Sequence, residues 1–138
     1  MSQFVEIELN RPRQFKLSIF DARDACRYLS NIPGKGSVDS LGLLMMLARR
    51  DLDGWSAVLA EGLKHEEAGL RPDRALRYLQ TYIQDAKTDA ERSERWAALA
   101  KGIRKAGEIG GVWDALEDGD REESSGNVRP STVSKPST

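Results

Sequence analysis

A run of apolar residues near the middle of the chain constrains its fold more than any other feature. Between Leu41 and Ala48 nearly every side chain is apolar, and Ser37 or Asp39 can begin a helix just before this run. We therefore predict a helix over Leu41–Arg50. The run is far short of the roughly 20 residues that span a membrane, so protein must cover it on more than one side. It is either the central helix of the domain or a helix that belongs half to the core and half to an interface.

The composition is that of one globular domain. Of 138 residues, 39% are apolar and 31% are charged, which disfavours both complete disorder and membrane residence. Lys and Arg (21) nearly balance Asp and Glu (22), so the chain lacks the overall positive field of a protein that coats nucleic acid. A single cysteine, Cys26, excludes an internal disulfide, and a single histidine, His65, argues against a zinc site. The N-terminus has no basic segment followed by an apolar stretch, which favours a cytosolic protein.

The last part of the chain is polar. From Glu117 onward only Val128 and Val133 are sizeable apolar side chains, among many Ser, Thr, Pro and Gly residues. Such a segment cannot bury enough surface to offset the entropy cost of ordering it. We therefore expect a single folded, α-rich domain over residues 1–116 and a flexible polar tail over 117–138. The alternative is a tail that orders on a partner.

Two short segments at the N-terminus predict a β-hairpin. Apolar and polar side chains alternate from Val5 to Leu9 and again from Phe15 to Ile19, on either side of a turn at Asn10–Gln14. A hairpin alone is marginally stable in water, so its apolar face must lie on helices or on another sheet. Its edge strand could also meet its copy in another subunit.

The chain after Phe20 predicts about five helices, because apolar residues recur at helical spacing between clear start and stop signals. The expected starts are Asp21, then Ser37 or Asp39, then Asp53, Pro72 and Thr88, and a short piece with Val112, Trp113 and Leu116 packs back at the end. The fold class is therefore α+β, mostly α-helical, with an N-terminal hairpin. The side chains expected to face inward are Ala22, Ala25, Cys26, Leu29, Trp55, Val58, Leu59, Leu63, Leu76, Leu79, Tyr82, Ile83, Trp96, Leu99, Ala100 and Ile103.

The sequence offers little for catalysis. Pro33–Ser37 contains glycines and a lysine before a helix, as an anion-binding loop would, but it lacks the phosphate-loop spacing, and a flexible connection is favoured. His65 is followed by two glutamates, which would suit a general base or a metal site, yet a solvent-facing histidine at a helix end is favoured. Cys26 is interpreted as a small core residue. We expect no catalytic residue, no metal and no cofactor, and hence no enzyme.

Basic residues do not form a nucleic-acid-binding pattern. Short pairs occur at Arg11–Arg13 and at Arg49–Arg50, and more cations lie near Arg104, where a helix C-terminus already favours them. The helix that follows Gly36 is apolar, whereas a recognition helix must be polar and basic to enter the major groove. The sequence thus argues against nucleic-acid binding, and a small DNA-binding regulator is kept only as an alternative.

Three stretches resemble the tail assembly chaperones of long-tailed, siphovirus-like bacteriophages and of related gene-transfer particles. Phe15–Leu29 resembles the family's strand that continues into a first helix. Leu52–Leu70 resembles its short helix with a Gly-Leu-x-His-Glu-like turn, and Leu70–Leu79 its Leu-Thr-Pro-Glu-type helix start. The resemblance covers about Phe15 to Ile83. Arg71 departs from the Thr or Ser that the family has at that helix start.

The resemblance implies a non-catalytic function in the host cytoplasm. Such proteins bind the long, helical tape measure protein and keep it soluble during tail assembly, often as homo-oligomers, and many also exist in a frameshifted longer form. The apolar helix could supply the contact surface, and Leu43, Met46 and Leu47 are the predicted protein-binding residues. The alternatives are another phage structural or adaptor protein retained in the virion, or the DNA-binding regulator.

Overall fold

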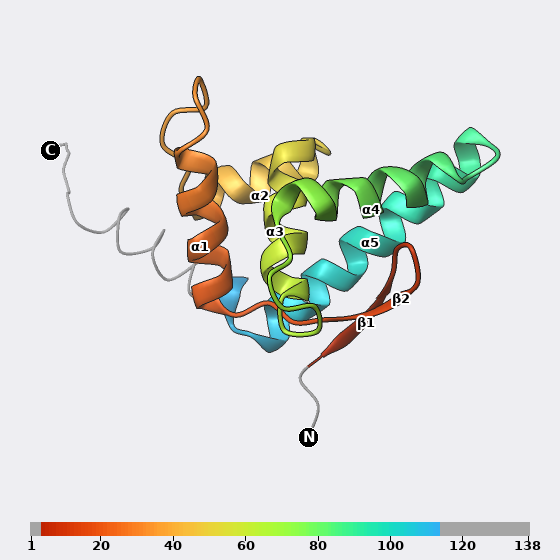
Figure 1. The fold of residues 1–138 in the computed structure, drawn as a ribbon, viewed down its shortest axis with the longest axis horizontal. Coiled ribbons are helices and arrows are strands. Elements are labelled where there is room, and N and C mark those ends of the chain that lie inside the picture. Colours follow the sequence, from red (N-terminus) through yellow and green to blue (C-terminus); the bar gives the residue numbers. More distant parts are fainter. Residues whose placement is uncertain (1–3, 114–138) are drawn as a thin grey trace, which may run out of the picture.

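The structure, a computed structural model that describes residues 4–113, consists of a two-stranded hairpin and five helices (Figure 1). This confirms the predicted α+β, mostly helical class. The predictions that concern Leu116 and the 117–138 tail lie outside the described residues. The elements are β1 (Val5–Glu8), β2 (Pro12–Phe15), α1 (Ile19–Ser30), α2 (Ser40–Ala48), α3 (Leu52–Leu63), α4 (Pro72–Gln84) and α5 (Asp89–Ile109).

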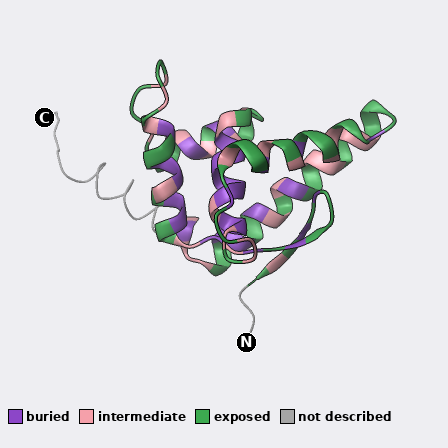
Figure 2. Cartoon of the chain, viewed as in Figure 1, coloured by how far each residue is buried: buried purple, intermediate pink, exposed green. Residues whose placement is uncertain are grey.

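The central helix is α3. It packs against α1, α2, α4 and β2, and nine of its twelve residues are buried (Figure 2). Of the two positions left open for the apolar Leu41–Ala48 run, the structure therefore excludes the centre of the domain. The reason is that α2 is only nine residues long and packs against α1 and α3, so part of its circumference stays at the surface.

The hairpin is antiparallel, with Val5 opposite Phe15 and Glu8 opposite Pro12. Its strand β1 packs on α5 and β2 packs on α3, as a hairpin of this size requires. The second strand covers Pro12–Phe15, so the predicted turn over Asn10–Gln14 was too long, since Pro12–Gln14 pair with Glu6–Glu8. The prediction that the strand continues to Ile19 was also wrong. The physical reason is a capping box at Ser18, whose side chain accepts from the Asp21 backbone N–H and so begins a helix there.

The helix starts follow the expected chemistry, with two shifts. Thr88 and Pro72 begin α5 and α4 as predicted, and of the two starts left open for the second helix, Ser37 and Asp39, the structure has Asp39 as the cap of α2. Helix α3 is capped by Asp51 rather than begun at Asp53, because the Asp51 carboxylate accepts from two backbone N–H groups. Helix α1 likewise begins before Asp21, which occupies the third position of the capping box.

Most of the predicted inward-facing side chains form one continuous core. The indole of Trp55 meets that of Trp96 edge to face, with ring centroids 5.1 Å apart. After α5 the chain folds back as predicted: Val112 is buried, and Trp113 Nε1 donates to the Arg104 carbonyl over 2.8 Å. Five of the predicted residues lie at the edge of the core and are half-buried: Leu76, Tyr82, Ile83, Trp96 and Ala100.

Candidate functional site

Two of the three predicted protein-binding residues lie in the core. Leu43 and Met46 are 3% and 4% exposed, and Leu47 is half-buried, with its carbonyl accepting from Trp55 Nε1 over 3.0 Å. Close packing onto α3 explains this: a Cβ atom on Gly54 would lie 2.7 Å from the Met46 Cβ. Leu43 and Met46 therefore hold α2 onto the body and present nothing to a partner in this fold.

The opposite face of α2 is apolar and open. Leu41 and Met45 are 48% and 52% exposed, Ala48 is exposed, and Leu44 is half-buried. These four residues, here called the α2 stripe, are spaced i, i+3, i+4 and i+7, so they lie on one side of the helix. No residue of α2 is charged. This face could not be selected from the sequence, because a helix that is apolar all round gives no signal of which side is covered.

Charges of opposite sign flank the α2 stripe. Asp39 caps the N-terminal end, where its Oδ1 accepts from the Gly42 N–H over 2.7 Å. Arg49 and Arg50 follow the C-terminal end. Arg50 has a left-handed φ of 59°, and its guanidinium lies 5.4 Å from the centroid of the Trp96 ring. The α2 stripe is thus negative at one end and positive at the other.

A second apolar surface is formed where the start of α1 meets the end of α5. A Cβ atom on Gly110 would lie 1.9 Å from the Leu17 carbonyl oxygen, which shows how closely these two ends pack. Three large apolar side chains are exposed on these ends, here called the α1–α5 surface: Ile19, Phe20 and Ile109. Phe20 is 69% exposed, more than any other large apolar residue of the described part of the chain.

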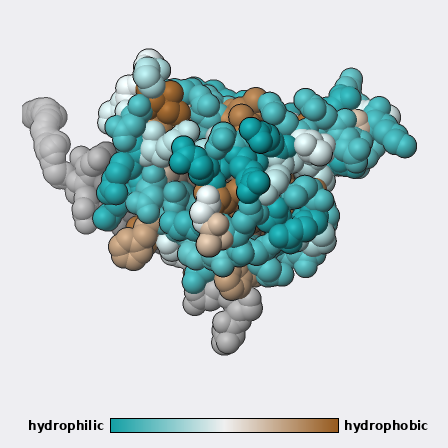
Figure 3. Space-filling model, viewed as in Figure 1, coloured by the Kyte–Doolittle hydropathy of each residue, from teal (hydrophilic) through white to brown (hydrophobic). Residues whose placement is uncertain are grey.

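The two surfaces lie at opposite ends of α1. Its last residue, Ser30, accepts from the Val38 N–H over 2.8 Å, which ties that end to the segment that leads into α2. Elsewhere the protein is mostly hydrophilic; on the face shown in Figure 3 the apolar patches are small and separated. Of the exposed large apolar residues in the described part of the chain, five belong to these two surfaces, and Phe4, Tyr28 and Leu52 lie outside both.

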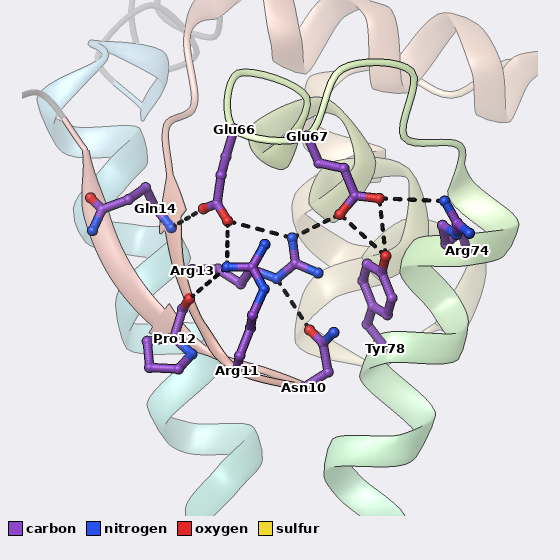
Figure 4. Close-up of polar contacts among 9 residues, drawn as sticks. All are labelled: Asn10, Arg11, Pro12, Arg13, Gln14, Glu66, Glu67, Arg74 and Tyr78. Carbon is purple, nitrogen blue, oxygen red and sulfur yellow. Dashed lines mark hydrogen bonds and ion pairs between the residues drawn. The ribbon is translucent and has the colours of Figure 1, made fainter.

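A buried arginine joins the hairpin to the α3–α4 connection (Figure 4). Arg13 is 2% exposed, its NH1 atom lies 2.8 Å from Glu67 Oε1, and its Nε atom donates to Asn10 Oδ1 over 3.1 Å. Tyr78 lies beneath the guanidinium, 4.6 Å from ring centroid to Cζ, and its hydroxyl also donates to Glu67. A buried charge needs such pairing, so the network fixes where the hairpin sits on the body.

The pKa values of this network follow from its contacts. Burial works to lower the pKa of Arg13, but hydrogen bonds with Glu67 and Tyr78 outweigh it, and the pKa is raised. The hydrogen bond from Arg13 lowers the pKa of Glu67. Glu66 completes the network: Arg11 NH1 lies 2.9 Å from its Oε1, and its Oε2 accepts from the Gln14 N–H. All these charges are paired within the protein, which indicates a structural role.

The histidine is partnered, contrary to the prediction of a solvent-facing side chain. His65 Nε2 lies 3.1 Å from Oδ2 of the buried Asp21, and Lys64 Nζ lies 3.5 Å from the other carboxylate oxygen. Burial works to raise the pKa of Asp21, but hydrogen bonds from Ser18 and His65 outweigh it, and the pKa is lowered. This contact joins the start of α1 to the end of α3.

The other residues singled out from the sequence have local roles. In the Pro33–Ser37 loop, Lys35 Nζ lies 3.3 Å from carboxylate oxygens of Asp51 and Asp53, so its charge is paired within the chain. Cys26 is buried, as predicted, and burial raises the pKa of its thiol. In the part of the chain that the structure describes, no group of three or more His, Cys, Asp or Glu side chains is placed to hold a metal ion.

None of the helices within residues 4–113 is long and apolar enough to cross a membrane. Comparisons with protein-family models, with curated proteins and with solved structures find no match to this chain.

Proposed function

We propose that this protein is a phage tail assembly chaperone, which binds the tape measure protein in the host cytoplasm and keeps it soluble without catalysing a reaction. The observation that carries the proposal is the pair of separate apolar surfaces, the α2 stripe and the α1–α5 surface, which together hold five of the exposed large apolar residues of the described part of the chain. Large exposed apolar side chains that gather at distinct sites are typical of protein-binding surfaces. The resemblance of Phe15–Ile83 to the tail assembly chaperones supplies the client.

The α1–α5 surface is the proposed client site. Phe20 stands out from it, with the Arg23 guanidinium 5.9 Å from its ring centroid, so an apolar anchor and a cation lie together. A tape measure helix with an apolar stripe would cover Phe20, Ile19 and Ile109 and place acidic residues near Arg23. Aromatic anchors of this kind contribute much of the binding energy of small interfaces.

Co-expression with the tape measure protein encoded by the same phage tests this function. We expect the wild-type protein to increase the soluble fraction of the tape measure protein and to co-purify with it, and Phe20→Ser to lose most of this effect. Tyr28→Ser is the matched control, because Tyr28 is an exposed aromatic residue near the other end of the same helix. A tape measure protein that is no more soluble with the wild type than with an unrelated protein would refute the proposal.

The fate of the protein in the finished particle separates this function from its alternative. A chaperone leaves before the virion is complete, so mass spectrometry of purified virions should not detect it. Its presence at the stoichiometry of a tail component would show instead that it is a structural or adaptor protein retained in the virion.

A further inference from the structure

We propose that the α2 stripe binds the α2 stripe of a second copy of this chain, with the two helices antiparallel about a two-fold axis. The inference does not depend on the proposed client, since it concerns the protein alone.

The spacing of the α2 stripe is symmetric about its own midpoint, between residues 44 and 45. When two such helices are antiparallel, Leu41 of each lies opposite Ala48 of the other, and Leu44 lies opposite Met45. A large exposed side chain therefore faces a small one at each end, and two flexible or medium-sized side chains meet in the middle. This is the self-complementarity that an isologous contact requires.

The flanking charges select the antiparallel orientation. Within residues 4–113 neither Asp39 nor Arg49 has an ion-pair partner of its own, whereas Arg50 is engaged with Trp96. The antiparallel arrangement places Asp39 of each copy beside the Arg49–Arg50 end of the other. A parallel arrangement would bring like charges and like helix dipoles together at both ends. Exposed charges of this kind contribute more to orientation than to affinity.

The size of the surface sets the strength of the contact. A helix of nine residues is about 14 Å long, so it offers much less than the roughly 800 Å² per partner of a stable interface. The pair should therefore exchange rapidly and depend on concentration. We expect sedimentation velocity of the purified full chain to show a monomer–dimer equilibrium between about 10 µM and about 1 mM.

Charge introduced on the α2 stripe is the first test. Met45→Glu should leave the protein monomeric over the whole concentration range, with an unchanged far-UV circular dichroism spectrum, because Met45 is half exposed and not part of the core. Tyr28→Glu, the matched control, should dimerise like the wild type. A wild-type protein that stays monomeric to about 1 mM, or a Met45→Glu protein that still dimerises, would overturn the proposal.

Cross-linking tests the orientation. In a Cys26→Ala background, proteins carrying Leu41→Cys and Ala48→Cys are mixed and treated with a bismaleimide whose reach is about 8 Å, close to the distance between packed helices. In the antiparallel pair, the thiol introduced at position 41 of one copy faces only position 48 of the other. We therefore expect cross-links between one Leu41→Cys and one Ala48→Cys chain to exceed those between two identical variants by at least about tenfold. An excess of cross-links between identical variants would refute the antiparallel orientation.

Discussion

At the scale of single residues, the least expected feature is an arginine in the core. Arg13 lies on the buried side of β2, as Phe15 does, although the sequence pattern places it in the turn of the hairpin, and its charge is matched by Glu67 and Glu66. In the sequence it stands out only as part of a basic pair, because its carboxylate partner Glu67 is 54 residues away along the chain. Long-range pairing of this kind leaves no periodic signal.

Removal of the Arg13 charge should destabilise the protein strongly. We expect Arg13→Ala to lower the free energy of unfolding by about 3 to 5 kcal/mol, because two carboxylates lose their buried partner. Urea denaturation followed by circular dichroism measures this. Arg11→Ala, which removes a more exposed arginine from the same Glu66, should cost about 1 kcal/mol or less. Equal losses for the two variants would show that burial of Arg13 does not matter.

The lowered pKa of Asp21 predicts a loss of stability in acid. A carboxylate whose pKa is lower in the folded than in the unfolded protein stabilises the fold above its unfolded pKa, and this contribution disappears as the pH falls through the folded pKa. The urea concentration at which half of the wild-type protein is unfolded should therefore decrease as the pH is lowered below about 4. Asp21→Asn should be less stable at pH 7 and less sensitive to acid, whereas the exposed control Asp73→Asn should follow the wild-type pH profile.

At the scale of elements, Gly62 determines how closely the hairpin approaches α3. A Cβ atom at this position would lie 2.0 Å from the Phe15 ring, and the Gly62 carbonyl accepts from the Lys16 N–H over 3.1 Å. A glycine inside a helix normally costs stability relative to alanine, so its presence here reflects the need for space.

Gly62→Ala should therefore destabilise the protein although alanine favours helices. We expect a loss of about 1 to 3 kcal/mol in thermal or urea unfolding, as for other overpacked cores. Adding Phe15→Leu should recover part of the loss, since the two residues compete for the same space. Strictly additive effects of the two substitutions would contradict the clash.

The helices were predictable from the sequence because their caps are local. The Thr88 side chain accepts from the Glu91 N–H, as the Thr88–Glu91 pattern indicated, and Asp39, one of the two candidate starts, caps α2. The end of β2 was not predictable, because alternation continues through Ile19 and only the Ser18 cap decides between strand and helix. The sequence also could not predict which side of α2 is exposed, since the packing of Met46 against Gly54 determines which apolar residues are covered.

At the scale of the whole molecule, the proposed contacts are independent because α1 separates them. Phe20→Ser should leave the monomer–dimer equilibrium of the purified protein unchanged, and Met45→Glu should still bind the tape measure protein, only more weakly. Sedimentation velocity and a pull-down with immobilised tape measure protein measure the two properties. Loss of both activities in either variant would show that the surfaces are one site or that the variant is misfolded.

An isologous contact through α2 also limits growth. Because each copy uses its whole α2 stripe on one other copy, association through α2 closes at two and cannot continue into a filament. The proposed pair would carry two α1–α5 surfaces, and after one had bound a long helical client, the second would meet the same client at a high effective concentration. With two binding surfaces per pair, each surface could be small and bind weakly. The two together would retain the client, and the client could still dissociate.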